Sequence, residues 1–349
     1  MPDPVPQPGD GLSLDAVARH LSPAGLQLDL AAGAVRLSGG LSNLNYLVRV
    51  NGRPAVLRRP PPGPLPPGAH DMAREHRVLS RLSRALPLAP DSFHLCEDVS
   101  VIGAPFQLLD YRTGLVVQGD RLPTEFATTD SRRDLSGELV RTLAAIHAVD
   151  ANAIGLGDLG RPEGFFERTT EGWRKRGAAV IEQDSSLKAV ETICNWLRAH
   201  APAPLAPTLL HSDFKLDNCM LSPERRVATV LDWDMGTRGD PLMDVAILMS
   251  YWTEPDDPPC MHRLAQMPTA APGFLSRREA VDLYGKISGR DVSDFPAWRI
   301  LALLKLAIVF LQLDRNWRRG AMGGEGDRGF GALGADILDY AARCVRDDM

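Results

Sequence analysis

The chain has 349 residues, of which 44% are hydrophobic and 24% are charged, a composition typical of a globular protein with a substantial core. Its formal net charge of -5 argues against broad nucleic-acid binding, because such binding needs a basic face that displaces counterions. The five cysteines are scattered and form no C-x-x-C pair, so neither a zinc site nor thiol redox chemistry is predicted.

No targeting or membrane segment is predicted. The first six residues lack the basic and apolar regions of a secretory signal. The most apolar stretch, Ile300–Leu313, has only fourteen residues and includes Lys305, so it is interpreted as a core helix rather than a bilayer span. We therefore expect a cytoplasmic protein that does not bind a membrane.

Residues 1–27 are predicted to form a disordered lead and a short helix over 13–20, capped by Ser13. Two strands are expected within 35–50, on either side of a glycine-rich turn. Such a turn lets backbone amides approach phosphate oxygens, although ordinary hairpins also have glycines at the tip. The turn residues predicted to bind a nucleotide are Gly39, Gly40, Ser42 and Asn43.

The next strand, 54–60, places Arg58 about ten residues after the hairpin. Protein kinases have the phosphate-binding lysine of V-A-I-K at this point, and an arginine can neutralise the same phosphates. Arg59 is the alternative. A helix over 71–86 then carries Glu75, which is placed to pair with Arg58 but could also be a solvated surface residue.

The strand 106–111 ends in Asp110 and Tyr111. In a kinase-like chain this is the connection whose backbone groups bind adenine. Helices are expected from here on, over 134–149 and within 171–200. The first should pack beneath the loop at 211–218, which is a candidate catalytic loop. His147 on that helix is interpreted as a core histidine.

The stretch 209–218 contains His-x-Asp-x-Lys-x-x-Asn after a short apolar strand, and Asp232 follows one hairpin later. This order matches the kinase catalytic loop and the later metal-binding aspartate. A polar turn between two core strands is the alternative. Asp213 is predicted to be the base, and Lys215 to neutralise charge on the transferred phosphate. Asn218 and Asp232 are predicted to bind magnesium. His211 is predicted to support the loop.

Further candidates follow the loop. Asp234 is a second choice of metal ligand, and Asp244 is predicted to support the catalytic loop after a helix N-cap at Asp240. An irregular segment, 253–273, is expected to shape an acceptor pocket. The basic and aromatic run 314–320 could hold an anionic group or merely end a helix. Helices are predicted over 276–288, 297–315 and 335–346.

Together these motifs resemble the aminoglycoside phosphotransferase-like family of small-molecule kinases, and within it the kinase-like domain of acyl-CoA dehydrogenase fusion proteins. The resemblance extends over nearly the whole chain after about residue 28. It implies an α+β, bilobal protein-kinase-like fold, with an N-terminal lobe over 28–111 and a helical C-terminal lobe over 112–349. It also implies that ATP and Mg2+ are used to phosphorylate a hydroxyl of a small molecule. The basic and aromatic run 314–320 points to an acceptor that carries a carboxylate or a phosphate, such as a hydroxy acid or its CoA ester.

Two other functions remain as alternatives. One is a catalytically silent nucleotide-binding module that acts through partners. The other is an aminoglycoside kinase, for which the acidic run 254–257 would supply the acidic pocket. Protein-kinase activity is disfavoured because no D-F-G to A-P-E segment follows Asp232. The sequence favours neither ATP nor GTP and predicts no oligomeric state.

Overall fold

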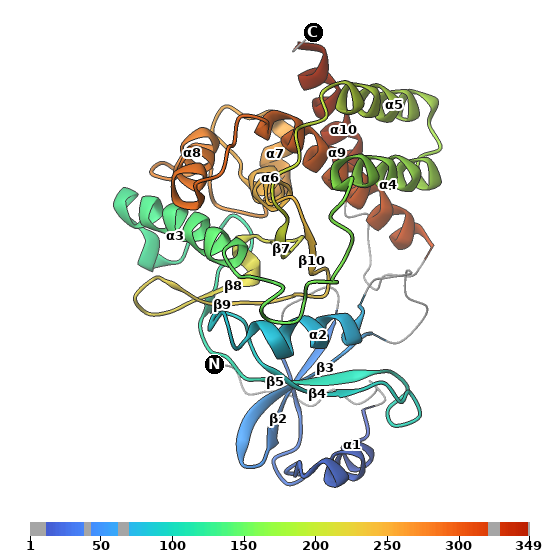
Figure 1. Cartoon of the computed structure of the whole chain (residues 1–349), viewed down its shortest axis with the longest axis vertical. Helices are drawn as coiled ribbons and strands as arrows, with labels where there is room; N and C mark the ends of the chain where they lie inside the picture. The colour runs from blue at the N-terminus through green and yellow to red at the C-terminus, as the bar shows by residue number, and fades with distance from the viewer. Residues whose placement is uncertain (1–11, 38–42, 62–69, 320–328, 348–349) are drawn as a thin grey trace.

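The computed structural model describes residues 12–37, 43–61, 70–319 and 329–347. A small part built on one sheet lies below a larger helical part (Figure 1). The sheet is antiparallel with the order β1-β2-β3-β5-β4. Its strands are β1 (Val35–Arg36), β2 (Leu44–Val50), β3 (Arg53–Arg59), β4 (Ser92–Cys96) and β5 (Phe106–Asp110).

One face of the sheet has its own core. Burial alternates along the end of β2, where Val48 and Val50 are buried on either side of exposed Arg49. These valines pack with Leu57 and Phe106 and with helix α1 (Leu14–Leu21). The predicted cap of α1 is confirmed, because Ser13 Oγ accepts a hydrogen bond from the amide of Ala16 at 3.3 Å.

Helix α2 (Met72–Leu82) lies between the sheet and the larger part (Figure 1). Val78, Leu79 and Leu82 are fully buried, and they belong to the core of the larger part rather than to the core over β2. The helix ends four residues before the predicted boundary at Leu86. Pro87 follows, and a proline disfavours helical geometry at the preceding residue.

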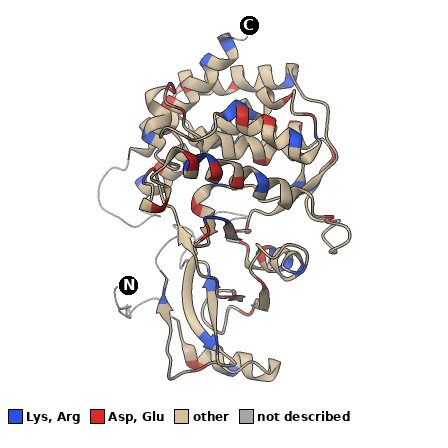
Figure 2. Ribbon diagram, turned by 90° about the vertical axis from the view of Figure 1, so that its left-hand side faces the viewer, with Lys and Arg blue, Asp and Glu red and all other residues tan. Residues whose placement is uncertain are grey.

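The larger part consists of seven major helices and short strands among the described residues. The helices are α3 (Thr129–His147), α4 (Phe165–Val180), α5 (Asp184–Ala199), α6 (Leu242–Tyr251), α8 (Arg277–Ser288), α9 (Phe295–Arg318) and α10 (Phe330–Asp347). The strands are β6 (Leu115–Val116), β7 (Thr208–Leu210), β8 (Cys219–Leu221), β9 (Val227–Val230) and β10 (Thr237–Gly239). Basic and acidic residues are interspersed along these helices (Figure 2).

Two further predictions need correction. Helix α3 begins at Thr129, five residues earlier than predicted, because Thr128 Oγ1 accepts a hydrogen bond from the amide of Ser131 at 3.1 Å and caps it. The segment 253–273 is not wholly irregular, since it contains the short helix α7 (Pro259–Leu264), which has prolines at its start.

Helix α9 corrects the length expected for the most apolar stretch. It has 24 residues and is long and apolar enough to cross a bilayer, but 67% of that window is buried inside the protein. It packs against α4, α5, α6 and α10. The interpretation as a core helix is therefore confirmed, and α9 brings Lys305 beneath the catalytic loop.

Candidate active site

The catalytic loop leaves the larger core at the end of β7. This strand is buried throughout and pairs with β10. His211 follows it and is fully buried, with Nε2 2.8 Å from the carbonyl oxygen of Leu231 and its ring 4.7 Å from that of Trp233. His211 therefore links the loop that carries Asp213 to the segment that carries Asp232, as expected for a supporting residue.

The structure brings Asp213, Lys215 and Asn218 together. Lys215 Nζ lies 2.5 Å from Asp213 Oδ2, and Asn218 Nδ2 donates to the backbone oxygen of Asp213 at 2.9 Å. Burial acts to raise the pKa of Asp213, but the ammonium groups of Lys215 and Lys305 outweigh it and hold that pKa below its usual value. The carboxyl group is therefore ionised, as a proton acceptor must be.

Asp244, at the start of α6, supports the loop. Its carboxylate accepts hydrogen bonds from the amides of His211 at 2.6 Å and Ser212 at 2.8 Å. His147 Nε2 lies 3.4 Å from the same carboxylate, and Nδ1 of this buried histidine is 2.8 Å from the hydroxyl of Tyr284. Asp244 thus fixes the backbone before Asp213, as predicted, and His147 is a core residue.

The smaller part contributes a buried cation that reaches across to the loop. Arg58 Nε lies 2.8 Å from Glu75 Oε2, which is the predicted pair, and Arg58 Nη2 contacts Asp232 Oδ1. Gln107 Nε2 donates to Glu75 Oε2 at 2.5 Å, and the amide of Trp233 donates to Oε1 at 3.2 Å. Glu75 therefore orients Arg58 toward Asp232.

Arg58 and Arg59 are adjacent on β3, and successive side chains of a strand point to opposite faces. The contacts of Arg58 with Glu75 and Asp232 place its face toward the catalytic loop. This favours Arg58 over Arg59 as the residue that faces the nucleotide phosphates.

The structure shows less about how the other predicted nucleotide-binding residues could contact a nucleotide. Gly39, Gly40 and Ser42 lie outside the described residues. Asn43 is buried, with Oδ1 2.9 Å from Nδ1 of His70. Asp110 accepts hydrogen bonds from the amide of Asp91 at 2.6 Å and from Arg112 Nε at 2.7 Å, so its side chain supports the connection to Tyr111. Nucleotide contacts at these positions stay predictions.

The oxygen atoms near Asp232 fit a magnesium ion. Burial and the nearby Asp232 and Glu75 carboxylates raise the pKa of Asp234 to about 7, a sign that this group of acids lacks enough positive charge. The amide nitrogen of Asn218 is used within the loop, which leaves its Oδ1 for a metal. Among the described residues no three His, Cys, Asp or Glu side chains form a metal cage. Mg2+ commonly binds to one or two carboxylates and to substrate phosphates, which suits such a site.

The acidic run that could have bound a polycation is neutralised internally. Arg277 Nη2 lies 2.5 Å from Glu254 Oε2, and Arg277 Nη1 lies 2.5 Å from Asp257 Oδ2. The Asp257 contact is bidentate, with a second bond of 2.7 Å to Oδ1. Both acids therefore fix the start of α8 and do not form a free acidic pocket.

Replacement of Asp257 by Asn should make stability less sensitive to acid. Burial acts to raise the pKa of Asp257, but its bonds to Arg277 hold that pKa below its usual value. Such a carboxylate stabilises the fold above its unfolded-state pKa of about 3.9, and the stabilisation is lost as pH falls through the lower folded-state pKa. Melting temperatures between pH 3 and 7 should show D257N destabilised at pH 7, with a difference that shrinks below about pH 4. A constant difference, or the same trend in the exposed control D282N, would contradict this.

The basic and aromatic run at the end of α9 is also partly used within the protein. Arg315 donates to the carbonyl oxygen of Ala179, and Arg318 Nε lies 2.8 Å from Asp314 Oδ2. The alternative of a helix end with its own compensating charges is thus supported over an anion-binding group.

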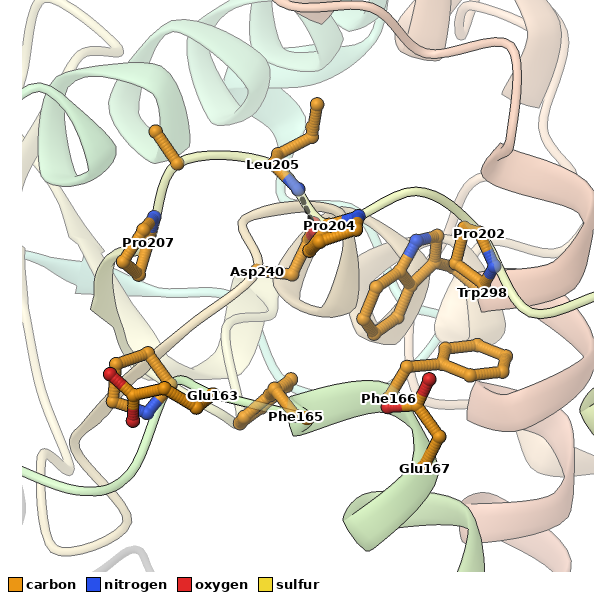
Figure 3. Close-up of a pocket in the computed structure, with 13 residues that line it drawn as sticks. Glu163, Phe165, Phe166, Glu167, Pro202, Pro204, Leu205, Pro207, Asp240 and Trp298 are labelled. Atoms are coloured by element: carbon orange, nitrogen blue, oxygen red, sulfur yellow. Dashed lines mark hydrogen bonds between the residues drawn. The ribbon is translucent and has the colours of Figure 1, made fainter.

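A cavity of about 520 Å³ lies elsewhere, at the start of α4 (Figure 3). Phe165, Phe166 and Trp298 form one side, and the prolines of segment 202–207 form another. Asp240 in its wall accepts a hydrogen bond from the amide of Leu205 at 2.9 Å. None of the predicted site residues lines this cavity.

Three residues of the site were missed by sequence reasoning. Gln107 faces Arg58 in the pairing of β3 with β5. Tyr251 ends α6 with its ring centroid 5.5 Å from Lys215 Nζ, and burial together with the Asp213 carboxylate raises its pKa. Lys305 approaches from α9. Of these three residues, only Lys305 was conspicuous in the sequence, because it is a charged residue inside the most apolar stretch.

The sequence profile of the phosphotransferase enzyme family APH matches residues 33–280. The chain belongs to this family. Mouse acyl-CoA dehydrogenase family member 11 is 30% identical over 315 residues, which are 88% of this chain and 40% of that protein. Mouse acyl-CoA dehydrogenase family member 10 is 38% identical over 209 residues, 59% of this chain and 19% of that protein. The chain therefore spans well under half of these relatives.

Solved structures of phosphotransferases share the fold. A Ralstonia eutropha protein provisionally named an aminoglycoside phosphotransferase aligns with a TM-score of 0.77 and 25% identity, over 96% of this chain and 98% of that one. Aminoglycoside phosphotransferase APH(4)-Ia in complex with ADP and hygromycin B aligns with a TM-score of 0.62 and 18% identity, over 94% and 98% of the two chains. The α+β, kinase-like architecture of this chain is therefore established, as is its sequence similarity to acyl-CoA dehydrogenase family members 10 and 11.

Proposed function

We propose that this phosphotransferase uses magnesium-ATP to phosphorylate a hydroxyl group of a small molecule, with Asp213 as the base. The observation that carries the proposal is the contact of Arg58, held by Glu75, with Asp232. Asp232 follows Leu231, whose amide bonds to Asn218 in the loop that carries the ionised Asp213. Those are the groups that phosphoryl transfer requires: a phosphate-binding cation, a metal-binding acid and a base for the acceptor.

In the proposed reaction the acceptor hydroxyl gives its proton to Asp213 while its oxygen bonds to the γ-phosphorus. The bond from that phosphorus to the bridging oxygen breaks, and ADP leaves with the bonding electrons. Lys215, 2.5 Å from Asp213 Oδ2, keeps the base ionised and lies near charge that develops on the phosphoryl oxygens.

Asn218 and Asp232 would hold Mg2+, with Asp234 as a further ligand. The ion would neutralise phosphate charge when bound. Arg58 contacts Glu75 and Asp232 in the structure. In the proposed reaction its guanidinium would stay with Glu75 and turn from Asp232 to the nucleotide phosphates.

For the acceptor we propose a hydroxy acid or its CoA ester rather than an aminoglycoside. The relation to acyl-CoA dehydrogenase family members supports this class. Against a polycationic acceptor, Glu254 and Asp257 are already neutralised by Arg277.

Release of ADP should be measured with hygromycin B, with 2-, 3- and 4-hydroxybutyrate, and with their CoA esters. Turnover of hygromycin B alone would overturn this choice.

Magnesium-ATP should raise the melting temperature of the wild type. A ligand that binds only the folded state, at one hundred times its Kd, stabilises it by about 2.7 kcal/mol. The shift should depend on magnesium and be lost in D232A, whereas the exposed-site control D282N should retain it. No shift with either ATP or magnesium-ATP would contradict the proposed nucleotide site and favour a silent module.

A further inference from the structure

Lys305 is a charged residue in a place where charge is costly. It lies on α9 between Leu304 and Leu306, both buried, and only 8% of Lys305 itself is exposed. An ammonium group taken out of water costs several kcal/mol unless hydrogen bonds and opposite charges compensate it. Among the described residues, Lys305 Nζ donates a hydrogen bond to the backbone oxygen of Ser212 at 3.1 Å. This bond offsets part of the cost of burying the ammonium group.

The Ser212 peptide is held from two sides. Lys305 of α9 binds its carbonyl oxygen, and Asp244 of α6 accepts from its amide at 2.8 Å. Ser212 has a φ of 69°, in the left-handed region that side chains other than glycine seldom adopt. A backbone in this conformation persists only where its surroundings fix it. Asp213 is the next residue, so these two bonds fix the backbone from which its carboxylate extends, while Lys215 contacts the carboxylate itself.

Burial and the nearby carboxylates act in opposite directions on Lys305, and burial dominates, so its pKa is lowered. Burial lowers the pKa of Lys305, whereas the Asp213 and Asp244 carboxylates raise it and Lys215 lowers it. The amine of Lys305 is buried and ends on the loop backbone. Lys305 therefore acts on Asp213 in two ways, through its hydrogen bond to the Ser212 peptide and through its charge, which lowers the pKa of the Asp213 carboxyl group.

We propose that Lys305 is a positioning residue for phosphoryl transfer, which fixes the Ser212–Asp213 peptide and so aims the base at the acceptor hydroxyl. This inference rests on the proposed function. A displacement of about 1 Å in a reacting group can cost about a hundredfold in rate. Loss of the Lys305 bond should therefore lower kcat without weakening nucleotide binding, since no contact of Lys305 involves Arg58 or Asp232.

The test compares Lys305→Met with the control Lys188→Met, which removes an exposed lysine on α5. Methionine has a similar length and suits apolar surroundings, so K305M should fold, with a melting temperature lowered by the loss of the bond to the Ser212 carbonyl oxygen. We expect its kcat, measured with magnesium-ATP and the best acceptor of the panel above, to fall 10- to 100-fold, while the KM for ATP stays within about twofold. K188M should match the wild type in both.

Amide hydrogen exchange provides a second readout that needs no turnover. In K305M, exchange over 209–218 should become faster while exchange over 297–304 of α9 is unchanged. Faster exchange confined to α9, or an unchanged loop with unchanged kcat, would overturn the inference in favour of a packing role. If the wild type phosphorylates no probe, the proposed function fails, and the exchange over 209–218 still decides whether Lys305 holds the loop.

Discussion

Asp213→Asn should reduce phosphate transfer about 10²- to 10⁴-fold, the range that a positioned general base contributes. The amide keeps the shape of the carboxylate and can still contact Lys215, but it cannot accept a proton from the acceptor. Nucleotide binding should survive, because Arg58 and Asp232 are untouched. Turnover and the magnesium-ATP melting shift should both be measured, so that the loss of chemistry is separated from a loss of binding.

The control for this variant is D282N, which makes the same chemical change on an exposed face of α8. It should retain full activity. If D213N keeps activity within a few-fold of the wild type, Asp213 is not the base, whatever its position in the loop. If D213N loses both transfer and the melting shift, the variant has disturbed the nucleotide site and the assignment again fails.

Arg58→Ala should have the second largest effect, on stability as well as on nucleotide use. Removal of one partner of a buried ion pair typically costs about 3–5 kcal/mol, because the other charge stays buried and uncompensated. Here that charge is Glu75, whose pKa is raised by burial. Urea unfolding should show the loss, and the KM for ATP should rise more than that for the acceptor. The exposed control R84A should change neither.

A double variant separates the two consequences of losing Arg58. Arg58→Met combined with Glu75→Gln removes both charges, and the glutamine oxygen can still accept from the amide of Trp233. Much of the lost stability should return, while ATP use should stay impaired. Recovery of ATP use in the double variant, or an unchanged KM in R58A, would point to Arg59 or to neither arginine.

The sequence predicted the parts of the site whose residues follow one another in a fixed order. Asp213, Lys215 and Asn218 share one loop, and the Asp232 hairpin returns directly to it. The pair of Arg58 and Glu75 was predictable because the strand and the helix that carry it are adjacent in the chain.

Contacts that depend on distant packing could not be predicted in this way. Lys305 meets Ser212 across 93 residues, and its position follows from how α9 lies in the core rather than from any local pattern. Gln107 depends on the register of β3 with β5. The acids of the run 254–257 looked available in the sequence, and only the fold shows that Arg277 neutralises them.

Helix α2 has a consequence for how this protein can be divided. It carries Glu75 for the active site, yet its apolar side belongs to the large core, and the amide of Val230 donates to the carbonyl oxygen of Leu88 just beyond the helix. A fragment that stopped after β5 would expose that apolar side to water, and the remainder would lose part of its interior. We therefore expect the two parts to unfold together as one cooperative unit. A chimera with a related protein should then exchange both parts at once rather than one of them.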